Sequence, residues 1–363
     1  MTTLKKIKVL YVLANLNQGG LETRLLELVP YFNIEEIEIS ILIHSRFRGV
    51  LEDRFSEYDI RIYSLPAFRL FSILEFNNEL AIFFRQHEFD VVHNNLTSYG
   101  AFHLYWAKQN DISMRISHSR SDQYGNGYFK NFVRFVFSIP NKYLSTHRLA
   151  VSELAGKKTF GHKYYEVLQN GFDKEKYAKN DYQGSQFRLE HNIPTNSFLI
   201  GHIGRFSKEK NQKFIVDVFF DYVAKNHDSF LVLIGVGKTK KNIVKLINLR
   251  KLDDKLLIID RVETSVGALN AFDLLVFPSL YEGYPGVVVE AQLVECSVIM
   301  SESITPRAVV SDKVYRLPLV KEEWLRAIQN VKSKTYIQDN DIHPVMDIKD
   351  VAKYLTKLYL QER

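Results

Sequence analysis

The chain has 363 residues and carries 48 Lys and Arg against 42 Asp and Glu, a net charge of +6. Its 46% hydrophobic and 25% charged residues exclude a disordered or collagen-like chain, and its length predicts two domains. The small positive charge does not by itself indicate nucleic-acid binding, and none is expected. Cys296 is the only cysteine, so no disulfide can form within the chain and a reducing, cytoplasmic compartment is expected.

Short apolar runs rich in β-branched residues predict the strands. The first apolar run, residues 9–13, follows Lys5, Lys6 and Lys8 and so imitates a signal peptide. The run is short, however, and no small-residue cleavage motif follows it. No run reaches the roughly 18 apolar residues that would span a bilayer. The predicted strands are 7–14, 38–44, 90–93, 114–118, 147–151 and 165–168, then 198–204, 230–235, 256–260, 274–278 and 297–300.

Helical patterns separate these strands. They cover residues 21–32, 212–225, 239–250, 287–295 and about 347–360. Continuous apolar strands alternating with helices predict parallel sheets covered on both faces, an α/β class. The alternation breaks near 169–173, before a polar stretch. We therefore expect two Rossmann-like, doubly wound domains, residues 1–172 and 173–345, facing across a cleft, and a segment 346–363 whose helix could pack back on the N-terminal domain.

Two cations follow the strand 198–204. Arg205 and Lys210 lie between this strand and the next helix. A guanidinium binds a phosphate through two parallel hydrogen bonds, and an ammonium adds a point charge, so together they suit a diphosphate. A solvated basic turn is the alternative.

Two carboxylates follow the strand 274–278. Glu282 lies in the loop, and Glu290 lies about one turn into a helix that begins near Gly286. The free amides of that helix start favour an anion. Carboxylates beside an anion site are explained if they accept hydrogen bonds from the hydroxyls of a ribose and a sugar. An exposed loop glutamate and an ordinary helical one are the alternative.

The two cations and the two glutamates, with seven residues between the latter, resemble the signature of the retaining glycosyltransferases of family 4, which have the GT-B fold. Residues 17–22 resemble the family's glycine loop after the first strand, and 115–120 its strand with the active-site histidine. Residues 301–305 resemble the subgroup that builds capsules and exopolysaccharides. The resemblance covers nearly the whole chain and is strongest over 198–306.

The resemblance implies a nucleotide-sugar donor, UDP rather than GDP, held by the C-terminal domain, and an acceptor held by the N-terminal domain. Arg205 and Lys210 would bind the diphosphate, Glu290 the ribose hydroxyls, and the backbone around Val262 the base.

The transferred sugar is assigned to further residues by the same resemblance. Glu282 would contact its hydroxyls, His118 would give or accept one hydrogen bond, and the glycines Gly19 and Gly20 would let the backbone approach the donor. Amides at Gly286 and Val287 would help to fix the sugar and phosphate.

Charge develops on the leaving diphosphate when a sugar–phosphate bond breaks. Arg205, Lys210 and a helix N-terminus direct positive potential at that group. The diphosphate can take the acceptor's proton, so no enzymic base is expected. Because Arg205 and Lys210 already stand at the diphosphate, no metal is expected, and no cofactor either. The spelling Asp-x-Asp at 339–341 has no strand before it and indicates a surface loop.

The leading expectation is transfer of a hexose or N-acetylhexosamine to a lipid-linked surface polysaccharide unit. A nucleotide-sugar 2-epimerase and a catalytically idle nucleotide-sugar-binding protein stay open. A hydrolase with two flanking carboxylates is disfavoured because Glu282 and Glu290 belong to one loop–helix unit. A dehydrogenase is disfavoured because residues 18–20 do not begin a Gly-x-Gly-x-x-Gly motif.

Basic charge is concentrated in residues 115–163. This segment holds nine Lys or Arg and two acids, a net +7, so the rest of the chain sums to −1. Aromatic and apolar residues mix with cations over 124–148, which is typical of an interfacial helix, although an ordinary core helix fits equally. Residues 68–85 are a second candidate. We expect peripheral attachment to the anionic inner face of the cell membrane.

Overall fold

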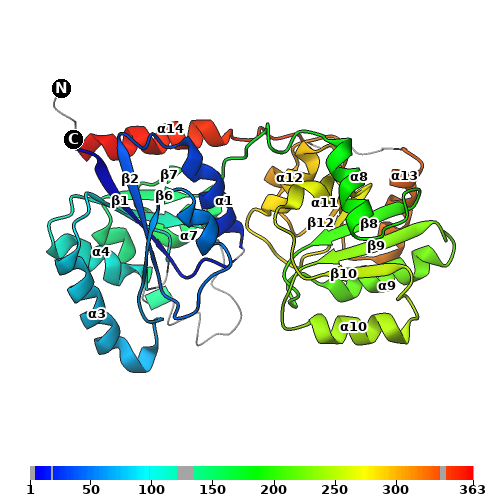
Figure 1. The fold of residues 1–363 in the computed structure, drawn as a ribbon, viewed down its shortest axis with the longest axis horizontal. Helices are drawn as coiled ribbons and strands as arrows, with labels where there is room; N and C mark the ends of the chain where they lie inside the picture. Colours follow the sequence, from blue (N-terminus) through cyan, green and yellow to red (C-terminus); the bar gives the residue numbers. More distant parts are fainter. Residues whose placement is uncertain are drawn as a thin grey trace. The chain divides into compact units, whose positions relative to one another are not determined.

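The computed structural model describes residues 5–17, 19–97, 99–120, 135–136, 138–335 and 341–362. The chain divides into two compact units (Figure 1). The N-terminal domain comprises residues 1–173 and 346–363, and the C-terminal domain comprises residues 174–345. The division falls one residue after the expected boundary. Each domain is described by itself.

The N-terminal domain is built on a parallel sheet of seven strands in the order β3-β2-β1-β4-β5-β6-β7. The strands are β1 (Ile7–Leu13), β2 (Ile37–Ile43), β3 (Arg61–Ser64), β4 (Val91–Asn94), β5 (Met114–Ser119), β6 (His147–Ala150) and β7 (Glu166–Val167). The described helices are α1 (Gly20–Leu28), α2 (Glu52–Ser56), α3 (Ile73–Gln86), α4 (Gly100–Gln109), α6 (Asn141–Leu144), α7 (Glu153–Phe160) and α14 (Ile348–Tyr359), with 3-10 turns at Val29–Tyr31, Leu70–Ser72 and Leu360–Glu362.

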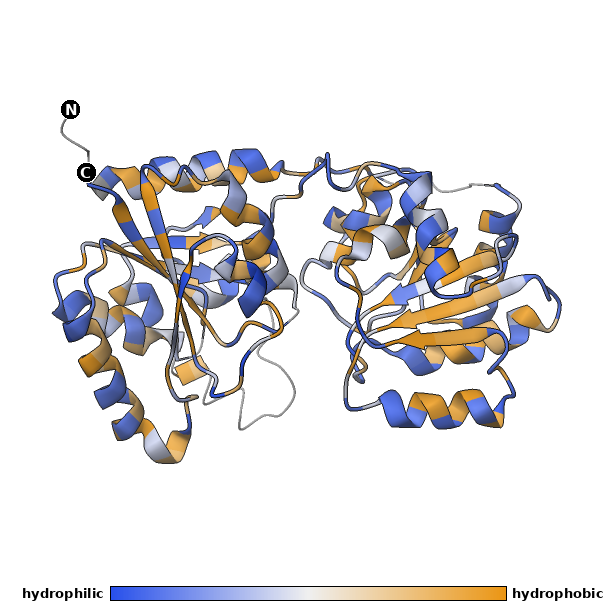
Figure 2. Cartoon of the chain, in the orientation of Figure 1, coloured by the Kyte–Doolittle hydropathy of each residue, from blue (hydrophilic) through white to orange (hydrophobic). Residues whose placement is uncertain are grey.

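Alternation along β1 supplies both faces of this sheet with core residues. Val9, Tyr11 and Leu13 pack on the side covered by α1 and α14, whereas Leu10 and Val12 pack on the side covered by α3 and α4. Figure 2 shows strands that are hydrophobic over most of their length and helices that alternate in hydropathy. This is the pattern of a sheet buried on both faces.

The helix α14 returns the chain to the N-terminal domain. Its apolar positions, among them Val351, Leu355 and Leu358, join the core beneath it. Asp347 caps its N-terminus, and Phe172 forms an isolated bridge with Asp347 just before the helix. Gly171 lies so close to this helix that a Cβ there would be 2.6 Å from the Ile348 Cα.

The C-terminal domain has a parallel sheet of six strands in the order β10-β9-β8-β11-β12-β13. The strands are β8 (Phe198–Ile203), β9 (Ser229–Ile234), β10 (Leu256–Ile259), β11 (Leu274–Phe277), β12 (Ser297–Ser301) and β13 (Val314–Leu317). The helices are α8 (Asp181–Glu190), α9 (Gln212–Val223), α10 (Lys240–Leu249), α11 (Ser265–Ala271), α12 (Gly286–Leu293) and α13 (Lys321–Lys332), with a 3-10 turn at Pro306–Ala308. The core on one face includes residues of α8, α11 and α12, and the core on the other includes residues of α9, α10 and α13.

Several sequence expectations need correction. The helix expected over 21–32 changes to a 3-10 turn after Leu28, because Pro30 cannot continue α-helical hydrogen bonding. Residues 124–134 and 137 of the candidate segment 124–148 lie outside the described residues. In the second candidate, 68–85, Leu70, Phe71 and Leu74 are exposed, while several later apolar residues are core. No helix in the described part of the chain is long and apolar enough to cross a bilayer.

Candidate functional site

The strand order of the C-terminal sheet reverses between β8 and β11. The chain moves outward from β8 to β9 and β10 on one side, and from β11 to β12 and β13 on the other. In open α/β sheets such a reversal leaves a crevice at the carboxyl ends of the two central strands, where ligands bind. The loop after β8 carries Arg205 and Lys210, and the loop after β11 carries Glu282.

Lys210 and Glu282 meet at this point. The Lys210 Nζ lies 2.5 Å from Glu282 Oε1, and each side chain is about one-fifth exposed (20% and 22%). The ammonium also lies 4.5 Å from the centroid of the Phe277 ring at the end of β11. Arg205 is exposed. The two loops are joined further by the Leu280 amide, which donates to the Glu209 carbonyl at 2.8 Å.

Buried polar residues hold the Arg205 loop. The Gln212 side-chain amide donates to the Arg205 carbonyl at 2.9 Å and lies 3.2 Å from His202 Nε2. His202 Nδ1 lies 2.9 Å from the Val276 carbonyl, so Nδ1 carries the hydrogen and Nε2 accepts. Burial lowers the pKa of His202 to about 4, against the opposing effect of that carbonyl. His202 is therefore neutral at pH 7.

Two glycines of the loop after β9 pack against the backbone of the Arg205 loop. Gly235 and Gly237 have φ of 150° and 154°, which side chains rarely adopt. A Cβ on Gly235 would be 2.1 Å from the Gly204 carbonyl oxygen, and one on Gly237 would be 2.2 Å from that of Phe206. The backbone on both sides of Arg205 is thus held by a close approach that only glycine permits.

The helix α12 follows the loop that carries Glu282. Gly286 is its first residue and Pro285 its N-cap, with no side-chain cap bond. Glu290 is buried in this helix and accepts a 2.6 Å hydrogen bond from the Ser265 hydroxyl at the start of α11. Val287 and Val262 are half-buried and pack against the core that contains α12.

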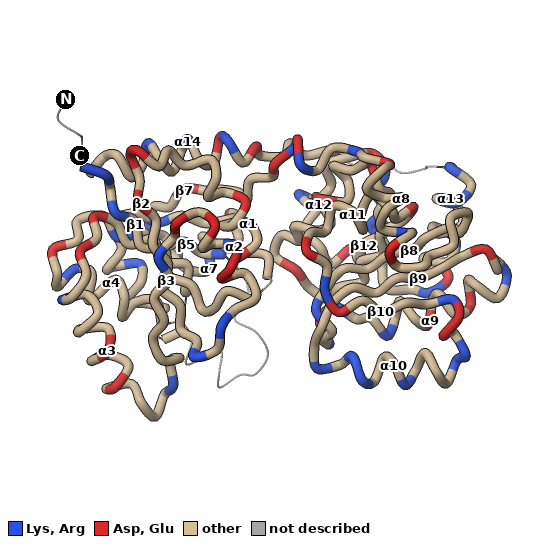
Figure 3. The backbone as a smooth tube through the Cα atoms, in the orientation of Figure 1, with Lys and Arg blue, Asp and Glu red and all other residues tan. Residues whose placement is uncertain are grey.

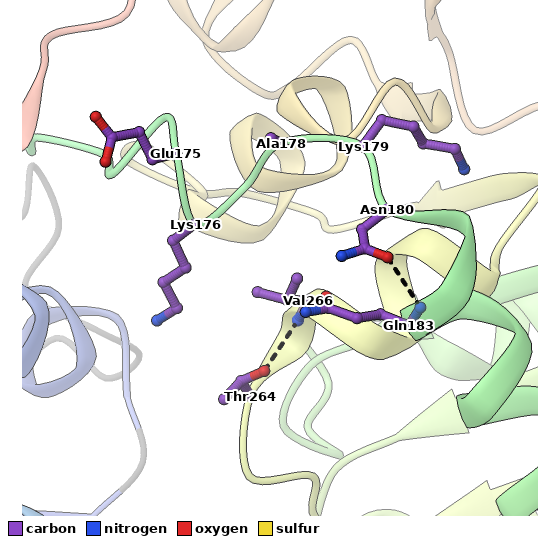
Figure 4. A pocket seen from close by; sticks show the side chains of 8 residues that line it. All are labelled: Glu175, Lys176, Ala178, Lys179, Asn180, Gln183, Thr264 and Val266. Carbon is purple, nitrogen blue, oxygen red and sulfur yellow. Dashed lines mark hydrogen bonds between the residues drawn. The ribbon is translucent and has the colours of Figure 1, made fainter.

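A cavity of about 350 Å³ lies elsewhere in this domain. It is lined by the segment before α8 and by the starts of α8 and α11, where Asn180 caps α8 and Thr264 caps α11 (Figure 4). Thr264 belongs to the loop that contains Val262. The cations and glutamates described above do not line this cavity, so it is not their site.

The N-terminal sheet also reverses its order, between β1 and β4. Gly19 and Gly20 follow β1 and begin α1. His118 lies near the end of β5 and is 1% exposed. Arg120, directly after this strand, is half-buried and donates to the Asn95 and Asn170 side-chain oxygens at 2.9 and 3.1 Å. His118 and Arg120 line one small cavity of about 20 Å³.

Sequence reasoning missed several of these contacts. Ser265, Gln212 and Arg120 were not singled out, because their partners lie on other elements.

Cys296 is buried, which raises the pKa of its thiol to about 12. The described residues hold no group of three or more His, Cys, Asp and Glu that could bind a metal ion. Acidic and basic residues are interspersed over both domains (Figure 3).

Comparisons with known proteins agree with this fold. The chain is 26% identical to the capsular polysaccharide biosynthesis glycosyltransferase CapH of Staphylococcus aureus, over 98% of this chain and 99% of that protein. It is 26% identical to the putative glycosyltransferase EpsF of Bacillus subtilis strain 168, over 83% and 80%. The structure of Anabaena HepE in complex with UDP-glucose is similar with a TM-score of 0.76 and 16% identity, over 98% of this chain and 97% of that one.

These likenesses confirm the expected two-domain α/β fold and the resemblance to glycosyltransferases of capsule and exopolysaccharide synthesis. Residues 185–351 match the family described as glycosyl transferases group 1. The chain has the GT-B fold, and its residues 185–351 are similar to the glycosyl transferases group 1.

Proposed function

We propose that this protein is a retaining, metal-independent glycosyltransferase of capsule or exopolysaccharide synthesis. It transfers a hexose or N-acetylhexosamine from a UDP-sugar to a hydroxyl of a lipid-linked saccharide. One observation carries the proposal: Lys210 and Glu282 meet at the point where the order of the C-terminal sheet reverses. The similarity to CapH and EpsF supports the pathway, and the UDP-glucose complex of HepE supports the donor.

In this proposal the C-terminal domain holds the donor. Arg205 and Lys210 bind the diphosphate, and Glu282 releases part of its contact with Lys210 to accept a hydrogen bond from the transferred sugar. Glu290, held by Ser265, accepts from the ribose hydroxyls. The amides of Gly286 and Val287 point at the group that becomes negative.

The reaction breaks the anomeric carbon–oxygen bond and forms a new one to the acceptor hydroxyl oxygen on the same face of the ring. The bonding electron pair leaves with the diphosphate, whose oxygen takes the acceptor's proton. Arg205 and Lys210 stabilise the charge on this leaving group, which is the role a divalent cation would otherwise have. The N-terminal domain binds the acceptor, with His118 beside the sugar and the Gly19 and Gly20 backbone close to the donor.

The test is transfer from labelled UDP- and GDP-sugars to short lipid-diphosphate saccharides, with the anomeric configuration of the product read by NMR. We expect transfer from a UDP-sugar with retained configuration, and equal rates with and without a chelator. Glu290→Ala should abolish most transfer. An inverted product or a rate restored only by Mg²⁺ or Mn²⁺ would overturn the corresponding part of the proposal, and epimerisation without an acceptor would replace it.

We further propose peripheral attachment to the inner face of the membrane through the basic segment 115–163. Arg120 is not counted in this surface, because its half-buried guanidinium donates to the Asn95 and Asn170 side chains. Tyr143 is 64% exposed, and the ammonium groups of Lys142 and Lys163 lie 5.2 and 5.4 Å from its ring centroid. Tyr164 beside them is also exposed. Exposed aromatic rings beside cations suit the headgroup region of an anionic bilayer.

Vesicle binding tests this attachment. Because each basic residue near an anionic surface contributes about 1 kcal/mol, the double variant Lys142→Glu/Lys163→Glu should bind anionic vesicles at least about 30-fold more weakly at low salt. The control Lys225→Glu/Lys251→Glu makes the same charge change at exposed sites of the C-terminal domain. Equal weakening in the control, or equal binding of the wild type to neutral vesicles, would contradict the attachment.

A further inference from the structure

Four buried side chains form a continuous chain of hydrogen bonds in the N-terminal domain, ending at His118. The hydroxyl oxygens of Tyr11 and Tyr359 are 2.6 Å apart, and the Tyr359 oxygen lies 2.7 Å from His93 Nδ1. His93 Nε2 lies 3.0 Å from His118 Nδ1. No member is more than 1% exposed. The helix α14 is thereby connected to three neighbouring strands, β1, β4 and β5.

The rings are also held by stacking. The centroids of Tyr11 and His93 are 4.7 Å apart, and those of His93 and His118 are 5.2 Å apart, with interplanar angles of 18° and 26°. A stacked imidazole cannot turn over without disturbing its neighbours. The two histidines therefore keep the nitrogens that face each other, and only the positions of the hydrogens are open.

Such a chain can run in two directions. In the first, Tyr11 donates to Tyr359, Tyr359 donates to His93, and His93 donates from Nε2 to Nδ1 of His118. In the second, every bond is reversed, and the Tyr11 hydroxyl hydrogen comes last. Among the described residues, the Tyr11 hydroxyl hydrogen would then have no acceptor. The positive charge of Arg120 also acts on the Tyr11 hydroxyl, and a cation favours a lone pair of the oxygen over its hydrogen. A buried hydroxyl without an acceptor is costly, so the first direction is favoured.

The first direction fixes the tautomer of His118. Because its Nδ1 accepts from His93, its hydrogen must be on Nε2. That nitrogen is buried and has no hydrogen-bond partner among the described residues. Burial, helped by Arg120 and His93, lowers the pKa of His118 well below its ordinary value, against the Leu168 carbonyl, so the ring is neutral at pH 7. His118 is thus a neutral N–H donor, and its side chain lines the small cavity that it shares with Arg120.

We propose that His93 and Tyr359 are positioning residues that hold His118 as an Nε2–H donor to an oxygen of the transferred sugar. This inference rests on the proposed function, in which His118 lies beside that sugar. An imidazole held in this tautomer has no free lone pair to accept the acceptor's proton. His118 therefore orients the sugar and does not act as the base, and the last residue of α14, far from His118 in sequence, takes part in that orientation.

The tautomer can be measured without substrate. In protein labelled with ¹⁵N-histidine, the NMR shifts and couplings of each ring nitrogen show which one carries the hydrogen. We expect a protonated Nε2 and a bare Nδ1 for His118, assigned by its loss in His118→Gln. Tyr359→Phe removes the donor to His93 and should move the His118 hydrogen to Nδ1 in part or all of the molecules. A wild-type His118 with its hydrogen on Nδ1 would overturn the proposal.

Kinetics test the consequence for transfer. Tyr359→Phe should lower kcat about threefold to tenfold, the effect of one hydrogen bond, with KM for the acceptor unchanged. The control Tyr315→Phe also loses one tyrosine hydrogen bond, a partly buried one to the Thr335 carbonyl, and should keep the wild-type kcat. His118→Gln, which retains an N–H donor, should be faster than His118→Met, which has none. The positioning role would be overturned if Tyr359→Phe had the same kcat as Tyr315→Phe and His118→Gln the same kcat as His118→Met.

The proposed function and the positioning of His118 can fail separately. If the wild type transfers no sugar from any nucleotide donor, the proposed function fails, while the NMR measurement still decides the direction of the hydrogen bonds. If the wild type is active but its His118 hydrogen is on Nδ1, only the positioning proposal fails. Should Tyr359→Phe not fold, the comparison of His118→Gln with His118→Met tests the requirement for a donor in its place.

Discussion

At the scale of single residues, the proposed function predicts that the ion pair between Lys210 and Glu282 matters more for activity than for stability. Both side chains are partly exposed, and pairs of this kind contribute only about 0–1 kcal/mol to stability. Lys210→Ala should therefore fold with nearly unchanged thermal stability but lose about 100-fold or more in kcat, because charge on the leaving diphosphate is no longer neutralised. Circular dichroism and steady-state transfer assays measure the two effects.

Lys213→Ala is the matched control for this prediction. Lys213 lies three residues after Lys210, in the first turn of α9; it is 71% exposed and pairs with Asp217. Its loss should leave kcat unchanged and alter stability by a few tenths of a kcal/mol at most. If the two variants lose activity equally, the loss reflects general surface charge and not contact with the donor.

The residues of the candidate site differ in how far the sequence could predict them. Arg205, Lys210 and Glu282 directly follow apolar strands, so their place at the carboxyl edge of a parallel sheet follows from local pattern alone. Ser265 could not be predicted as the partner of Glu290, because a hydrogen bond across 25 residues depends on how α11 packs against α12. The same reason hid the contact between His93 and Tyr359, which are 266 residues apart.

At the scale of elements, the docking of α14 depends on Gly171. A Cβ at this position would lie 2.6 Å from the Ile348 Cα, and backbone cannot move aside as easily as a flexible side chain. Gly171→Ala should therefore destabilise the protein by about 1–3 kcal/mol, lowering its thermal midpoint. Gly20→Ala is the control, because nothing lies within 4 Å of a Cβ there and the residue is the first of α1.

The same control tests a role in binding. Gly20→Ala should leave the thermal midpoint unchanged or slightly higher, since alanine favours a helix. If the Gly20 backbone approaches the donor as proposed, KM for the nucleotide sugar should rise. Destabilisation by Gly20→Ala, or none by Gly171→Ala, would contradict the distinction between a glycine needed for packing and one needed for access.

Elements with continuous apolar sequence were predictable, and two of the four edge strands were not. The core strands β1, β8 and β11 are within a residue or two of the expected ranges, because strands buried on both faces need an unbroken apolar run. The edge strands β3 (Arg61–Ser64) and β13 (Val314–Leu317) were missed. Residues Arg61 and Ser64 are exposed and the two between them half-buried, so the strand β3 lacks the apolar signal that identifies its neighbours.

At the scale of the whole molecule, buried histidines link stability to pH. Burial lowers the pKa of five of them below the ordinary value of 6.5, to about 4 for His44 and His202. The five are His44, His93, His103, His118 and His202. Since the unfolded chain takes up these protons near pH 6.5 and the folded one only at lower pH, stability is fully present above about pH 6.5 and falls between about 6.5 and 4. For His202 alone the shift corresponds to about 3 kcal/mol.

Unfolding in urea at pH 7.5, 6.0 and 5.0 measures this loss. We expect the midpoint to fall steeply with decreasing pH, by more than protonation of carboxylates in this range would produce, since most carboxylates titrate near pH 4. In the C-terminal domain, His202→Gln replaces the neutral ring by an amide that can still donate to the Val276 carbonyl and accept from Gln212, but cannot gain a proton. Its midpoint should lie lower than that of the wild type at pH 7.5 and fall less between pH 7.5 and 5.0. An unchanged pH dependence in this variant, or a midpoint independent of pH in the wild type, would show that these rings are not held neutral by burial.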